Sequence, residues 1–102
     1  GTFESLNGYT VNGTAEIITR GEDRRLVLSD DFSSSIGPDV LVYLAKNNVI
    51  EDGGVVEDPV SLGLIKSFTG GQEYILPANV DEYASVVLWC RAFSVSFGAA
   101  SV

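Results

Sequence analysis

Short runs of apolar residues, separated by frequent turn residues, make up most of this chain, and the pattern predicts strands rather than helices. We expect strands near residues 2–6, 13–19, 24–29, 39–45, 72–77 and 85–97. The turn signal Gly21-Glu22-Asp23 predicts that the second and third of these form a hairpin. The prediction is an all-β fold, a single-domain antiparallel β-sandwich with little helix, over residues 1–102.

Three stretches between these turns carry further signals. Residues 40–44 are almost continuously apolar, which predicts a central strand that is covered on both faces. Residues 47–59 are acidic and rich in turn-forming residues, so we expect a long solvated loop or a small hairpin. Residues 81–84 predict one helical turn, with Asn79 as its cap.

The last expected strand, residues 85–97, admits two assignments of its faces. In an unbroken strand Arg91 would lie in the core beside Trp89, and an unpaired buried guanidinium is costly. A β-bulge near residues 91–92 turns Arg91 outward, and we favour this assignment. Its buried face holds Val86, Leu88, Cys90, Phe93, Val95 and Phe97. In both assignments Trp89 and Arg91 share the face opposite to Cys90.

Composition and charge exclude several classes of function. A net charge of −8 repels phosphate backbones and anionic membrane surfaces, so we expect no nucleic-acid partner. No apolar stretch approaches the roughly 20 residues of a membrane helix, so we expect no membrane insertion of this domain. Without histidine or methionine the usual zinc, copper and haem ligands are missing. No nucleophile–base pair, P-loop or dinucleotide fingerprint is present, so hydrolytic catalysis is not expected.

Cys90 is the single cysteine, and it lies in the most apolar run between Arg91 and the single tryptophan, Trp89. A lone cysteine forms no internal disulfide, so we expect a monomer under reducing conditions. The chain begins without methionine or a signal-like segment, which we interpret as a domain separated from its targeting segment.

The run from Val86 to Gly98, with Trp89-Cys90-Arg91 at its centre, resembles the closing motif of the electron-transfer DM-thirteen domain family. Other stretches resemble the family in the same order along the chain. They are Gly1-Thr2-Phe3, Gly13-Thr14-Ala15, residues 26–32, Gly37-Pro38-Asp39 with Val42-Tyr43-Leu44, residues 62–66, Gly71-Gln72-Glu73-Tyr74 and Leu76-Pro77. Residues 47–61 do not match, but the resemblance otherwise covers nearly the whole chain.

The resemblance implies a β-sandwich that often stands beside DOMON domains in extracellular animal proteins and in bacterial exported or lipid-anchored proteins. The implied location is extracytoplasmic, in the periplasm or at the cell surface. The implied function is electron transfer, with Cys90 as the redox centre, either as a bare thiol or as the ligand of a prosthetic group such as haem. The expected partner is then a redox protein or an extracellular ligand.

Three functions remain open. The first is an electron-transfer or thiol-redox module centred on Cys90, which requires an accessible thiol with a favoured thiolate. The second is an extracellular binding or adhesion domain in which Cys90 is a buried packing residue. The third is a haem-carrying domain, for which Cys90, Tyr43 and Tyr74 are the candidate iron ligands. Cofactor-binding residues would be Cys90, Trp89 and Tyr43, and we favour the bare thiol over haem.

Asp39 follows the rigid Gly37-Pro38 turn, and two interpretations apply to its side chain. It is either a carboxylate that faces calcium or another ligand, or a turn-stabilising group that bonds to nearby backbone amides. We favour the second interpretation.

Overall fold

The computed structural model describes residues 1–78 and 82–102, and ten strands lie within them. They are β1 (Glu4–Ser5), β2 (Val11–Asn12), β3 (Ala15–Arg20), β4 (Asp23–Leu28), β5 (Ser33–Ser34), β6 (Val40–Ala45), β7 (Val60–Leu64), β8 (Gln72–Ile75), β9 (Ser85–Cys90) and β10 (Val95–Ser101). None of the described segments is a helix that is long and apolar enough to span a membrane. Asn79 and residue 81, the cap and the start of the predicted helical turn over 81–84, lie outside the described part of the chain, and residues 83–84 are not helical.

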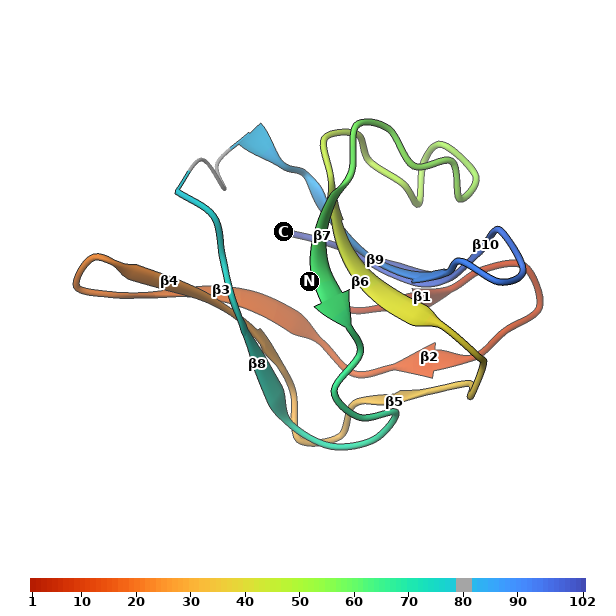
Figure 1. The fold of residues 1–102 in the computed structure, drawn as a ribbon, viewed down its shortest axis with the longest axis horizontal. Helices are drawn as coiled ribbons and strands as arrows, with labels where there is room; N and C mark the ends of the chain where they lie inside the picture. The colour runs from red at the N-terminus through yellow and green to blue at the C-terminus, as the bar shows by residue number, and fades with distance from the viewer. Residues whose placement is uncertain (79–81) are drawn as a thin grey trace.

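The strands form antiparallel sheets, as predicted (Figure 1). The largest sheet has five strands in the order β1-β10-β9-β6-β7, and a second has three strands in the order β3-β4-β8. Strands β2 and β5 pair with each other. The fold is therefore the all-β antiparallel sandwich that the spacing of apolar runs predicted.

The predicted hairpin is formed by β3 and β4, which pair from Ala15 opposite Leu28 to Arg20 opposite Asp23. The connecting loop has two residues and begins with Gly21, whose φ is 63°. Two-residue loops with glycine at this position match the right-handed twist of the flanking strands. The predicted hairpin is thus confirmed, and the length of its loop sets the register.

The main core lies between the five-stranded and the three-stranded sheets. Strand β6 contributes Val40, Val42 and Leu44 to this core, while Ala45 faces the other side of the sheet and is also buried. This confirms the prediction of a central strand that is covered on both faces. The three-stranded sheet contributes Ala15, Leu26, Leu28 and Tyr74 to the same core.

The other face of the five-stranded sheet is covered by residues 46–59, which form the long green loop between β6 and β7 in Figure 1. Val49 of this loop is completely buried against Val87 and Ala99. The loop was predicted correctly as a loop, but it is a packed cover as well as a solvated segment. Strand β7, which follows it directly, was not predicted.

The predicted single strand over residues 85–97 is wrong, because the chain turns back at residues 91–94 and forms the β9–β10 hairpin. Ser94 has a φ of 52°, a left-handed conformation that ends such a turn. The predicted bulge near residues 91–92 is also wrong: the pairing with β9 shifts between Ser96 and Gly98. Phe93 lies in the turn and is 54% exposed, so it does not belong to the buried face.

Candidate functional site

Cys90 is completely buried in the main core, on the side of β9 that faces the three-stranded sheet. Its thiol donates a hydrogen bond to the carbonyl oxygen of Pro38, with Sγ and oxygen 3.1 Å apart. Val86 and Leu88 face the same core. The structure thus gives Cys90 the environment of a packing residue, because free cysteines in apolar surroundings behave as small hydrophobes.

Asp39 and Arg91 form a corner of the fold next to Cys90, since Asp39 follows Pro38 and Arg91 follows Cys90 in the sequence. The guanidinium donates two hydrogen bonds to the carboxylate, at 2.7 Å from Nε and 2.8 Å from Nη2. The backbone amide of Arg91 donates to the Asp39 carbonyl at 3.1 Å. Hydrogen bonding to Arg91 lowers the pKa of Asp39, and the same bonds raise the pKa of Arg91. The interpretation of Asp39 as a side chain that bonds to backbone amides is therefore wrong: its carboxylate forms an ion pair that joins the residue before β6 to the residue after β9.

Trp89 and Tyr43 lie on the opposite face of the same sheet. Trp89 pairs with Leu41 across β9 and β6, so Tyr43, two residues further along β6, is its diagonal neighbour. Diagonal neighbours are within reach of aromatic side chains. The two rings stack with centroids 6.4 Å apart and planes inclined by 20°. The structure thus brings two predicted site residues together and places the third, Cys90, behind them.

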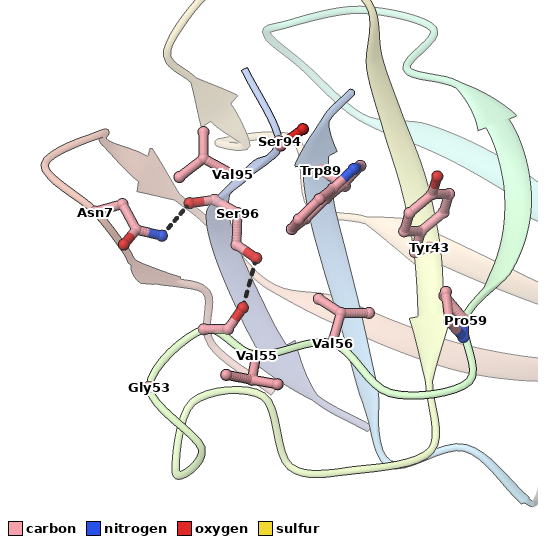
Figure 2. Close-up of a pocket in the computed structure, with 11 residues that line it drawn as sticks. Asn7, Tyr43, Gly53, Val55, Val56, Pro59, Trp89, Ser94, Val95 and Ser96 are labelled. Atoms are coloured by element: carbon pink, nitrogen blue, oxygen red, sulfur yellow. Dashed lines mark hydrogen bonds between the residues drawn. The ribbon is translucent and has the colours of Figure 1, made fainter. Parts of the chain in front are cut away.

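The stacked rings form part of the wall of a pocket of about 600 Å³ (Figure 2). The pocket lies between the sheet and the loop that covers it. Its lining residues are Asn7, Tyr43, Gly53, Gly54, Val55, Val56, Pro59, Trp89, Ser94, Val95 and Ser96. None of these residues carries a charge. A mostly apolar pocket of this volume with a few polar groups is typical of a small-molecule site.

Two hydrogen bonds hold the walls of the pocket in place, and both are drawn in Figure 2. Asn7 donates from Nδ2 to the Ser96 carbonyl at 2.9 Å. Ser96 donates from Oγ to the Gly54 carbonyl at 2.8 Å and so ties the loop to β10. The pocket is therefore a built feature of the fold, because its cover is bonded to its base.

The candidate haem ligands do not converge. Cys90 Sγ lies in the core, whereas Tyr43 lies on the opposite face. The Tyr74 hydroxyl accepts a hydrogen bond from the Lys66 amide and donates one to Gln72, and burial raises its pKa. Haem iron is held by axial side-chain ligands, and of these three candidates only Tyr43 lines a pocket. The candidates therefore provide no pair of axial ligands, and no cluster of three metal-binding side chains occurs among the described residues.

The loop side of the pocket was missed from the sequence. Val55, Val56 and Pro59 lie in the stretch that was interpreted as solvated, and Asn7 lies near the other end of the chain. The available signal was the pair of adjacent valines after two glycines, which is unusually apolar for an exposed acidic loop.

One family model, described as Electron transfer DM13, matches residues 2–102. No curated protein and no solved structure matches the chain.

Proposed function

Since the chain belongs to the electron transfer DM13 family, we propose that it is an electron-transfer domain that works outside the cytoplasm and exchanges electrons at the Trp89 pocket. The observation that carries this proposal is the opposite placement of two consecutive residues. Trp89 forms part of the wall of an open pocket, whereas Cys90 is completely buried. A molecule from solution therefore reaches this strand through the indole and not through the sulfur. The extracytoplasmic location rests on the family resemblance.

The burial of Cys90 limits the chemistry of its thiol. Thiol–disulfide exchange requires a thiolate to touch the sulfur that it attacks, and oxidation of a cysteine follows its exposure. Cys90 Sγ donates to the Pro38 carbonyl and has no exposed surface. In this proposal the redox-active group is a small molecule in the pocket. Cys90 packs in the core and so stabilises β9, the strand that carries Trp89. The thiol-redox alternative requires the corner to open.

A second candidate is a non-catalytic binding domain of an extracellular protein. The observation that favours it is that the pocket is complete without Cys90, so ligand binding needs no redox role for the sulfur. Its partner would be an extracellular ligand instead of a redox protein. The two candidates share the pocket and differ in whether electrons are exchanged.

An anaerobic reductive titration of the purified chain separates these functions. We expect the wild type, with the small molecule bound in its pocket, to take up electrons from the reductant. Trp89→Ala should lose this uptake, and Cys90→Ser should keep it. Loss in Cys90→Ser alone would instead make the sulfur the redox centre. If the folded wild type takes up no electrons with any bound molecule, electron transfer is excluded and the binding domain stands.

A further inference from the structure

The lining of the Trp89 pocket has features that restrict its ligand. We propose that the pocket binds an uncharged, planar ring with carbonyl groups at its edge, the chemistry of a quinone. This inference rests on the proposed function, because it names the class of molecule that the electron-transfer site takes. Three properties of the pocket support it: its shape, its charge and its hydrogen-bonding groups.

The shape of the pocket suits a flat apolar body. Trp89 and Tyr43 stack on one side, and Val55, Val56 and Pro59 of the loop lie across from them (Figure 2). Aromatic faces prefer to stack in an offset manner on other flat rings. A ring that enters between the indole and the valines therefore contacts an aromatic face on one side and aliphatic groups on the other.

The charge of the pocket argues against an ionic ligand. None of its lining residues is charged, while the chain as a whole carries a net charge of −8. An anion would lose hydration without gaining an ionic partner, and the field of the whole chain would repel it. A cation would be attracted to the surface but would find no carboxylate inside the pocket. The uncharged ring is the form that the lining accepts.

The polar groups at the edge of the pocket suit a ligand that accepts hydrogen bonds. The Asn7 amide has two hydrogens and gives one to the Ser96 carbonyl. The second hydrogen remains for a ligand. Ser94 also lines the pocket, in a turn that is exposed to solvent. Carbonyl oxygens on the edge of a ring are matching acceptors, which distinguishes a quinone from a plain hydrocarbon ring.

Trp89 makes the inference directly testable, since it is the only tryptophan of the chain and lies in the pocket. The experiment titrates the whole folded chain with 1,4-naphthoquinone and follows indole fluorescence, with N-acetyltryptophanamide as the control for collisional quenching. We expect saturable quenching of the chain and linear quenching of the control. An anionic naphthoquinone sulfonate should bind at least about tenfold more weakly, the result of about 1.4 kcal/mol of lost binding.

Two matched variants separate the pocket from the rest of the surface. Val55→Glu places a carboxylate at the pocket on a residue that is 57% exposed, so the fold tolerates it. Ile75→Glu makes the same type of change on a residue of β8 that is 72% exposed and lies outside the pocket. We expect Val55→Glu to weaken naphthoquinone binding at least about tenfold, whereas Ile75→Glu should leave it unchanged. Equal effects of both variants would overturn the assignment.

The failure of this inference differs from the failure of the proposed function. If quenching is linear for the chain, or if a neutral oligosaccharide saturates the site instead, the quinone assignment is overturned. Electron uptake that is lost in Trp89→Ala would still support the proposed function in that case. Saturable naphthoquinone binding without any electron uptake would support the ligand class and overturn electron transfer.

Discussion

Cys90 should be nearly unreactive toward thiol reagents while the chain is folded. The perturbation is the addition of a chromogenic disulfide reagent to the native chain and, separately, to the chain unfolded in urea. In the folded state the thiol is completely buried and donates to the Pro38 carbonyl. Labelling therefore requires an opening of the corner formed by residues 37–39 and Arg91.

The protection of Cys90 against labelling can be calculated from the interactions that this opening breaks. The opening breaks the exposed ion pair of Asp39 and Arg91, which contributes little because solvent screens it. It also breaks two hydrogen bonds, one from Cys90 Sγ to Pro38 and one from the Arg91 amide to Asp39, at about 1 kcal/mol each. Gly37 lies directly against the Phe97 ring, since a Cβ there would be 2.7 Å from Cζ. Uncovering this buried phenylalanine costs about 2 kcal/mol more. An opening free energy of about 4 kcal/mol slows labelling about a thousandfold.

The assay compares the two labelling rates at the same pH and reagent concentration, after correction for the effect of urea on a model thiol. Asp39→Asn is the informative variant, because asparagine tolerates the left-handed φ of 61° but forms no ion pair. We expect it to label faster than the wild type. A native rate within tenfold of the unfolded rate would show that the thiol is accessible, and the thiol-redox function would then replace our proposal.

Three further predictions test the packing and the electrostatics. Trp89→Ala should lower the free energy of unfolding by about 2 kcal/mol, because roughly 100 Å² of apolar surface is lost from a half-buried indole; a loss above about 4 kcal/mol in urea denaturation would mean full burial. The pKa of Asp39 lies below 3.8, so its pair with Arg91 stabilises the fold above that pH and is lost as pH falls through the lower folded value. Thermal melts should therefore show Asp39→Asn less stable than the wild type at pH 6, with the gap closing below pH 3.8; a constant gap would contradict the pairing. Gly98→Ala should cost about 1–3 kcal/mol in the same urea assay, since its Cβ would lie 2.7 Å from Val11 Cγ2, and an unchanged stability would disprove that contact.

The sequence predicted the fold class and the long strands because their signals are local. The hairpin of β3 and β4 follows from β-branched residues around one glycine turn, and β6 follows from an uninterrupted apolar run. Strands β2 and β5 have two residues each and exist only because distant segments pair. Such pairing leaves no periodic signal in the sequence. Strand β7 also lacks a clear signal, because Gly63, with a φ of 100°, interrupts its regular pairing with β6 and its alternation of apolar and polar residues.

The faces of the last segment were harder to predict because a turn there has the same effect on the faces as the predicted bulge. The turn at residues 91–94 reverses the chain and pairs Val95 with Cys90, so that Val95 lies on the same face as Cys90. The predicted bulged face consequently contained the correct core residues, except for Phe93, for an incorrect reason. Periodicity alone does not distinguish a bulge from a turn when both bring the same side chains inward.

The candidate site was only half predictable, and alternation along β9 explains which half. Strand β9 is an inner strand of the five-stranded sheet, and its two faces have different surroundings: one packs the core and the other supports the pocket. Consecutive residues of such a strand cannot share an environment. Once Cys90 packs in the core, Trp89 must face the loop, and a single-residue shift would exchange them. The buried thiol and the accessible indole are therefore two consequences of one register, which is why the sulfur and the pocket have to be tested separately.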